Sequence, residues 1–254
     1  MTARERPVAL VTGASRGIGA AVARRLARDG MAVAVNSHPR ERMVTLAEGV
    51  VESIIGARGQ AQVYPADITR PDDVESMFAR CERDLGRVSV LVLNASMVAR
   101  GRWQEIPVDQ WDAMLAVSLR GAFLCARHAF GRDSGTGGRI VAVSSVLART
   151  GAPGSLHYGT AKAGLVGFTR SLARELGARA VRVNCVMPGA IVTEEELESF
   201  PDREEADLEA ISKQCLRRRG LPEDVAAVVS FLAGPDSDFV TGQTLVVDGG
   251  WVMG

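Results

Sequence analysis

The sequence has few lysines, few aromatic side chains and no net charge. Of its 254 residues, 30 are basic and 30 are acidic, so the formal charge at pH 7 is zero, and only Lys162 and Lys213 are lysines. A balanced charge provides neither a basic field for nucleic acid nor a polybasic patch for a membrane surface. Aromatic residues make up only 5% of the chain, so no stacking platform for a flat substrate stands out. Electrostatic binding to nucleic acid or to a membrane surface is therefore excluded as the main function.

Long apolar runs and paired cysteines are also missing. The longest hydrophobic stretch, around residues 225–233, is far shorter than the ~20 residues that cross a bilayer. The first residues, MTARERP, lack the apolar segment of a signal peptide. We therefore expect a cytoplasmic protein without a metal site, and reduced thiols buried as small apolar side chains at Cys81, Cys125, Cys185 and Cys215.

Short valine-rich runs alternate with longer helical patterns along the chain. In the helical pattern over residues 17–29, Ile18, Val22 and Leu26 repeat at helical spacing. The apolar runs are mostly continuous, as in strands buried on both faces, and they predict strands at residues 8–12, 32–36, 61–64, 88–94, 139–144, 181–186 and 244–247.

This alternation predicts right-handed crossovers and an α/β fold. We expect one domain over residues 1–254, a Rossmann-type doubly wound parallel sheet of seven strands with helices on both faces. Residues 131–138 are expected to form a loop. A polar insertion at about 190–219 precedes the last helix and strand.

The segment TGASRGIG, residues 12–19, joins the first predicted strand to the first predicted helix. Gly13, Gly17 and Gly19 permit a tight turn and a close approach of backbone to a phosphate, and the helix N-terminus offers free amides and a positive dipole end. A turn that only needs small residues is the alternative. The position between strand and helix favours a dinucleotide site.

No acidic residue occurs at the end of the second predicted strand, where residues 34–40 read AVNSHPR. A carboxylate there would bond the ribose hydroxyls and repel a 2′-phosphate. Its absence, with Arg16, His38 and Arg40 nearby, favours NADPH over NADH. His38 and Arg40 can equally be solvated loop residues, whereas Arg16 lies inside the phosphate turn.

Tyr158 and Lys162 are four residues apart, so they share one face of a helix. A tyrosine hydroxyl titrates near ~10, and a nearby ammonium lowers that pKa and makes tyrosine usable as a general acid or base. Ser145, at the end of a predicted strand, can hold a substrate oxygen. Ser144 is the competing serine, and the alternation from Val143 favours Ser145. An ordinary pair on a helix surface is the alternative to a reactive one.

These motifs, with TGQTLVVDGG at residues 241–250, resemble the short-chain dehydrogenase/reductase family, in particular the 3-oxoacyl-carrier-protein reductases. The resemblance covers residues 7–254. It implies that Tyr158 delivers a proton, that Lys162 tunes it and binds the nicotinamide ribose, and that Ser145 orients a carbonyl which receives hydride. It further implies cofactor contacts from Gly13, Ser15, Arg16, Gly17, Ile18, Gly19, Ser37, His38, Asp67, Ile68, Asn94, Ala95, Ser96, Tyr158, Lys162, Pro188, Gly189, Ile191 and Thr193.

Two of these positions have specific roles in the family. Asp67 matches the residue that bonds the adenine amino group. Its rival interpretation is a helix cap, for which Asp72 is better placed. Thr193 falls where the family bonds the nicotinamide carboxamide.

The chain departs from the family pattern in two places. Leu93 and Ser96 replace the first and last residues of an Asn-Asn-Ala-Gly segment, so we expect lost side-chain ties between central strands and added bulk near the cofactor. In the helix expected over residues 110–130, Ser118 replaces a catalytic asparagine thought to hold a proton-relay water. Serine is shorter but still binds water, so we expect a working but slower enzyme.

Substrate specificity is expected in residues 96–103, 146–157 and the insertion after Pro188, because loops at the carboxyl ends of strands form the crevice. The acidic run at 193–201 is interpreted as a solvated helix face, with a closing lid as the functional alternative. The basic run Arg217–Arg219 either meets an acidic carrier protein or is a solvated helix end. Candidate apolar wall residues, each equally consistent with core, are Met97, Trp103, Leu147, Leu156 and Met187.

We therefore expect NADPH-dependent reduction of a small or carrier-bound ketone, 3-oxoacyl or related, to a secondary alcohol. The alternatives are an NAD(P)-dependent alcohol or sugar dehydrogenase, or a catalytically weak dinucleotide-binding scaffold. The family resemblance implies a homotetramer, with a dimer possible, and neither a nucleic-acid nor a membrane partner.

Overall fold

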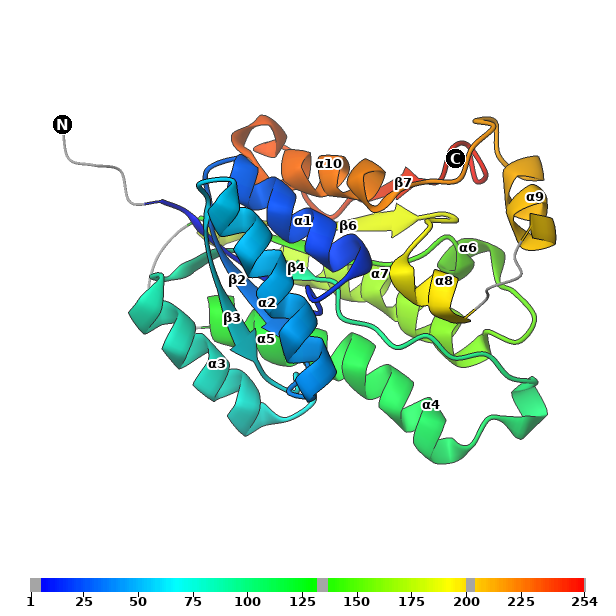
Figure 1. Ribbon diagram of the computed structural model, residues 1–254, viewed down its shortest axis with the longest axis horizontal. Helices are drawn as coiled ribbons and strands as arrows, with labels where there is room; N and C mark the ends of the chain where they lie inside the picture. Colours follow the sequence, from blue (N-terminus) through cyan, green and yellow to red (C-terminus); the bar gives the residue numbers. More distant parts are fainter. Residues whose placement is uncertain (1–5, 132–136, 200–203, 254) are drawn as a thin grey trace.

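The computed structural model describes residues 6–131, 137–199 and 204–253. Within them, seven parallel strands form one sheet in the order β3-β2-β1-β4-β5-β6-β7 (Figure 1). The expected fold class is confirmed, and each strand end lies within two residues of its predicted position. The strands are β1 (Val8–Val11), β2 (Ala32–Ser37), β3 (Gln60–Pro65), β4 (Val88–Leu93), β5 (Gly138–Val143), β6 (Val181–Pro188) and β7 (Thr244–Val247).

Helices cover both faces of the sheet. Alternate strand residues point to opposite faces, and because both sets are apolar, each face must be covered. Leu10 belongs to a core cluster beneath α3 (Pro71–Asp84), α5 (Gly121–Phe130) and α7 (Leu156–Leu176). The next residue, Val11, belongs to a second cluster beneath α1 (Gly17–Arg28), α2 (Glu41–Gly56) and α10 (Pro222–Ala233) (Figure 1). The sheet is therefore buried on both faces, as the continuous valine-rich runs predict.

The helix expected over residues 110–130 is interrupted. It consists of α4 (Val108–Leu115), a π-helical turn at Ala116–Arg120, and α5. Ser118 lies inside this π turn. Such turns interrupt the regular ladder and are often found at functional sites.

The shorter elements complete the described chain. They are α6 (Leu147–Thr150), α8 (Glu194–Ser199), α9 (Glu204–Ser212) and 3-10 turns at Trp103–Glu105, Gly177–Arg179 and Pro235–Ser237. Residues 132–136 of the expected loop and 200–203 of the expected insertion lie outside the described residues. Within the described ranges, none of the helices has the length and apolarity to span a bilayer.

Two local expectations were wrong. Asp72 does not cap a helix, because α3 already begins at Pro71 and its N-cap residue is Arg70. Proline suits the first helical position, since its missing N–H would have no partner there. Cys215 is exposed, whereas Cys81, Cys125 and Cys185 are buried as expected. Among the described residues, no group of three or more side chains could hold a metal ion.

Candidate active site

The glycine-rich turn follows β1 at the middle of the sheet, where the strand order reverses and β1 lies between β2 and β4. Ligands of such sheets bind at this edge. The side chain of Asn94, directly after β4, donates to the carbonyls of Thr12 and Gly13, both at 3.0 Å. The Thr12 hydroxyl accepts from the N–H groups of Asn94 and Ala95. Asn94 and Thr12 thus join the ends of β1 and β4. Leu93, which was expected to cost such ties, is an apolar core residue.

The turn needs glycine at two positions. Gly13 has a φ of +62°, and a Cβ there would lie 2.8 Å from the Cα of Ala95. A Cβ on Gly19 would lie 2.4 Å from the carbonyl oxygen of Gly13 and 2.5 Å from the amide nitrogen of Asn94. The turn therefore packs directly against the end of β4, and the first amides of α1 are left for an anion.

An anion is found at these amides. The N–H of Gly17 donates to Oε2 of Glu194 at 2.9 Å. The N-terminus of a helix binds carboxylate and phosphate oxygens in the same way. The Glu194 oxygen therefore shows that this N–H is available to an anion. The turn therefore fits the diphosphate of a dinucleotide.

The basic residues beside the turn are not those expected, apart from Arg16. Arg16 pairs with Glu195 at 2.8 Å and with Glu198 at 3.2 Å. His38 is exposed, and its Nδ1 accepts from the backbone N–H of Arg40. Arg42 pairs with the same Glu198, at 2.5 Å. Arg42 was not predicted from the sequence, although it lies only two residues beyond the segment AVNSHPR. Its position beside Arg16 depends on the first turn of α2, and the sequence pattern shows no sign of this contact.

Ser145, Tyr158 and Lys162 come together where β5 ends and α7 begins. Tyr158 is half-buried and forms a side-chain hydrogen bond with Ser145. The Nζ of Lys162 donates to the carbonyl of Val143 at 2.8 Å and lies 5.6 Å from the centroid of the Tyr158 ring. The Ser144 hydroxyl instead donates to the carbonyl of Lys162 at 2.7 Å and so is committed to joining strand and helix.

Burial governs the titration of both α7 residues. It raises the pKa of Tyr158, which the hydrogen bond with Ser145 lowers and the charge of Glu195 raises further. It also lowers the pKa of Lys162 to about 8, because the ammonium is removed from water. The expected lowering of the Tyr158 pKa was therefore wrong in sign, since desolvation of the phenolate outweighs its stabilisation. At neutral pH the phenol keeps its proton.

The segment after β6 leads over the turn. A Cβ on Gly189 would lie 2.5 Å from the Cβ of Asp248, so β6 and the chain end pack closely there. Ile191 forms an isolated bridge with Gly220. The Thr193 hydroxyl accepts from the N–H of Glu196 at 3.3 Å and so lies at the start of α8.

The acidic run is a solvent-exposed helix face, as the sequence suggested, but its carboxylates are also paired. Glu194, Glu195 and Glu198 all contact the phosphate turn or its neighbouring arginines. The basic run is not a free helix end. Arg219 has a side chain only 9% exposed and pairs with Glu196 and Asp207, while Arg218 pairs with Asp224.

Known proteins share this arrangement over the whole chain. A family model described as enoyl-(acyl carrier protein) reductase matches residues 13–252. The 3-oxoacyl-[acyl-carrier-protein] reductase of Synechocystis sp. is 40% identical over 100% of both chains. The short-chain dehydrogenase/reductase eriH of Hericium erinaceus is 38% identical over 96% of each. The chain belongs to the short-chain dehydrogenase/reductase family.

Solved structures agree. The crystal structure of a blue fluorescent protein from a metagenomic library in complex with NADPH has a TM-score of 0.89 and 36% identity, covering 97% of this chain and 98% of that one. A short-chain dehydrogenase/reductase from Serratia marcescens has a TM-score of 0.88 and 34% identity, covering 96% and 97%. This member of the family is an NAD(P)-dependent oxidoreductase acting on CH–OH groups.

The remaining cofactor positions predicted from the family differ in exposure. Asp67 Oδ1 accepts from both the N–H and the hydroxyl of Thr69, so this carboxylate stabilises its own turn. Ser96 is half-buried, and its hydroxyl donates to the Met97 carbonyl. The others are mostly inside. Ser15 and Ile68 are buried, Ile18 packs on the core, and Pro188 lies within β6. Ser37 is fully buried, and its hydroxyl has no hydrogen-bond partner among the residues that the structure describes.

Ser118, the departure from the catalytic asparagine of the family, is only 2% exposed. Its hydroxyl has no hydrogen-bond partner among the described residues. A buried hydroxyl in this state is uncommon and is a natural position for a bound water.

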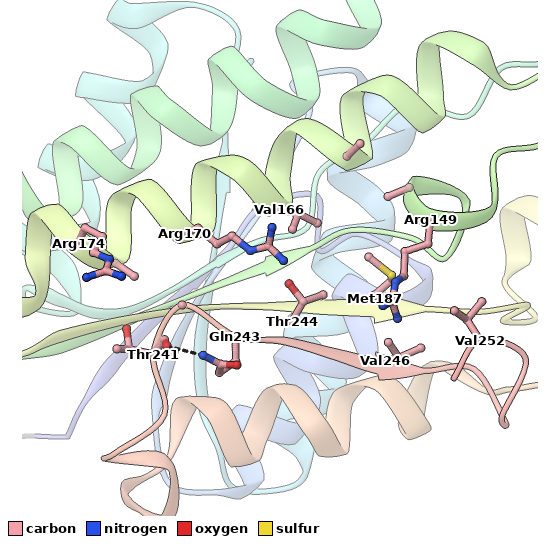
Figure 2. A pocket seen from close by; sticks show the side chains of 14 residues that line it. Arg149, Val166, Arg170, Arg174, Met187, Thr241, Gln243, Thr244, Val246 and Val252 are labelled. Carbon is pink, nitrogen blue, oxygen red and sulfur yellow. Dashed lines mark hydrogen bonds between the residues drawn. The ribbon is translucent and has the colours of Figure 1, made fainter. Parts of the chain in front are cut away.

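A cavity of about 1010 Å³ lies elsewhere, between α7 and β7 (Figure 2). The side chains of Arg149, Arg170 and Arg174 line it, and none of the predicted catalytic or cofactor-binding residues does. Met187, a candidate wall residue, also lines this cavity and is otherwise core, whereas Trp103 is 67% exposed. The cavity is therefore distinct from the site around Tyr158.

Proposed function

We propose that this enzyme reduces a ketone to a secondary alcohol with NADPH, and that Tyr158 is the proton donor. The substrate class is a 3-oxoacyl compound or related carbonyl, free or on a carrier. The observation that carries the proposal is the hydrogen bond between Tyr158 and Ser145, with Lys162 Nζ 5.6 Å from the centroid of the Tyr158 ring. The phenol is protonated at neutral pH, as an ordinary tyrosine is, and burial raises its pKa further. A protonated phenol is an acid, as reduction requires.

In this mechanism the bound nicotinamide supplies the hydride that the carbonyl carbon receives. The Ser145 hydroxyl donates to the carbonyl oxygen and holds it beside Tyr158. As negative charge develops on that oxygen, the Tyr158 phenol transfers its proton to it, which completes the alcohol. The Lys162 ammonium stabilises the phenolate left behind, because it lies 5.6 Å from the ring in a site shielded from water.

The preference for NADPH rests on charge. Arg16 and Arg42 both bind Glu198, so their guanidinium groups converge on one anion. The end of β2 offers no carboxylate that would repel a 2′-phosphate, since its last residues are Asn36 and Ser37.

We also propose a cytoplasmic homotetramer, or a dimer, built from a single catalytic domain in which residues 190–219 act as a lid. Support for association comes from β7, an edge strand that stays half-buried beside the α7 cavity (Figure 2). An unpaired apolar edge is a surface on which another chain can pair.

The decisive experiment assays a panel of ketones, including 3-oxoacyl thioesters, with NADPH and NADH side by side, and the matching alcohols in the oxidative direction. We expect reduction with NADPH to be fastest. Faster oxidation of alcohols or sugars with NAD would favour the dehydrogenase alternative. Nucleotide binding without turnover of any compound would favour the scaffold.

A further inference from the structure

The carboxylates of the acidic helix α8 contact the first turn of α1 and the guanidinium groups of Arg16 and Arg42. We propose that these carboxylates compete with the phosphates of the dinucleotide, and that Glu198 opposes the 2′-phosphate and thereby sets the discrimination between NADPH and NADH. This inference rests on the proposed function, because it concerns the same cofactor site. In this role the carboxylates of α8 are competitors of the cofactor that belong to the protein itself.

The first contact lies at the N-terminus of α1. Glu194 Oε2 accepts from the N–H of Gly17 at 2.9 Å, and a Cβ on Gly17 would lie 3.4 Å from Thr193. Since α1 is 12 residues long, its first amides carry the positive end of a helix dipole. A diphosphate oxygen bonded to the same N–H requires the Glu194 carboxylate to leave.

The second contact is with the two arginines. Glu198 Oε1 accepts from Arg42 at 2.5 Å and Oε2 from Arg16 at 3.2 Å, while Glu195 accepts from the other amino group of Arg16 at 2.8 Å. The hydrogen bond from Arg42 holds the pKa of Glu198 below its usual value, so this carboxylate is charged at neutral pH. Guanidinium groups bind carboxylate and phosphate in the same geometry. A 2′-phosphate held by Arg16 and Arg42 would therefore have to displace Glu198.

An ion pair on another face of α8 holds the helix in place. Glu194, Glu195 and Glu198 therefore all reach the first turn of α1 and its neighbouring arginines. Glu196 pairs with the largely buried Arg219, which also donates to the Ala190 carbonyl. Glu194 and Glu198 are four residues apart and share a helix face. The competition is therefore a property of the anchored helix, in which each carboxylate opposes its own phosphate: Glu194 the diphosphate and Glu198 the 2′-phosphate.

The test measures the Kd of NADPH and of NADH by fluorescence titration of the full chain. The variants are Glu194→Gln and Glu198→Gln, which remove charge and keep shape. Glu205→Gln is the matched control, because Glu205 is an exposed acidic residue of α9 outside these contacts. Thermal melting of each variant verifies that it is folded.

We expect Glu194→Gln to tighten both nucleotides by the same factor, about three- to tenfold, because it removes an anion from a helix terminus. Glu198→Gln should tighten NADPH by about threefold and leave NADH unchanged, because only NADPH carries the 2′-phosphate. Glu205→Gln should match the wild type for both.

Three results would overturn the inference while leaving the proposed function intact. They are wild-type affinity in both variants, weaker binding in either, or equal tightening of NADH and NADPH by Glu198→Gln. Failure of the wild type and of every variant to bind either nucleotide would instead refute the proposed function, and the inference with it.

Discussion

At the scale of single residues, the site is controlled by burial more than by the attraction between its charges. Burial raises the pKa of Tyr158 and lowers that of Lys162 to about 8. Both shifts favour the neutral form, because transfer out of water penalises the charged one. The phenol is thus kept as an acid, while the ammonium is retained at a cost in stability.

Tyr158→Phe removes the hydroxyl and keeps the ring. We expect kcat for ketone reduction to fall by at least ~100-fold, because a positioned acid contributes that much or more, while the Kd of NADPH stays unchanged. Steady-state kinetics and nucleotide titration check this. Unchanged reduction of a good substrate would refute Tyr158 as the proton donor.

Lys162→Met tests the cost of the buried ammonium. At pH 7 we expect the free energy of unfolding to rise by roughly 1–2 kcal/mol, since the lost desolvation penalty outweighs the lost bond to Val143. The folded pKa of about 8 lies below the ordinary 10.5. The penalty is therefore full below pH 8 and disappears as the pH rises towards 10.5. Urea unfolding at pH 7 and pH 10 should show the variant's advantage shrinking at the higher pH. A variant less stable than the wild type at pH 7 would contradict this.

The same pKa predicts the pH dependence of reduction. We expect kcat/KM to fall as the pH rises through about 8, because a neutral Lys162 no longer stabilises the phenolate. A pH profile recorded with NADPH measures this. A flat profile to pH 9.5 would show that the charge of Lys162 is not needed.

Ser118 is interpreted as a weakened substitute for asparagine in a proton relay. Because its buried hydroxyl has no hydrogen-bond partner in the part of the chain that the structure describes, Ser118→Ala should change the free energy of unfolding by less than about 0.5 kcal/mol and yet lower kcat. Ser118→Asn should keep or raise kcat. If Ser118→Asn lowered the turnover number, this interpretation of Ser118 would be wrong.

At the scale of elements, the close packing of the glycine turn against the end of β4 leaves no room for a side chain at Gly19. Gly19→Ala places a Cβ 2.4 Å from the Gly13 carbonyl and forces the turn or Asn94 to move. We expect weaker NADPH binding and a loss of about 1–3 kcal/mol in the free energy of unfolding, as for other overpacked sites. Gly49→Ala, in α2 with no heavy atom within 4 Å of its Cβ, is the control, and a similar loss in both would argue against a steric cause.

At the scale of the whole molecule, the sheet ends in two edges, β3 and β7. The α7 cavity beside β7 collects three arginines and several apolar side chains away from the catalytic site (Figure 2). The proposed subunit interface at β7 is therefore separate from the catalytic site. We expect substitutions in β7 to change the oligomeric state and to leave catalysis largely unaffected.

Val246→Lys tests this separation. We expect it to reduce the assembly to smaller species in light scattering coupled to gel filtration, because a charge on a half-buried edge strand opposes pairing. Ile55→Lys, at an exposed position of α2, is the control and should not change the mass. An unchanged mass for Val246→Lys would argue against β7 as the interface.

The sequence by itself determined the sheet and the positions of its reactive residues. Valine-rich runs and helical spacing are local patterns, so all seven strands were predictable to within two residues. The turn TGASRGIG and the spacing of Ser145, Tyr158 and Lys162 are local in the same sense, since each motif is held by one strand end and one helix start. Only the tertiary structure joined Arg16 and Arg42 to Glu198 and brought α8 onto the phosphate turn, because these contacts join residues more than 150 positions apart. It also reversed the expected direction of the Tyr158 pKa, because desolvation depends on what surrounds a side chain in space.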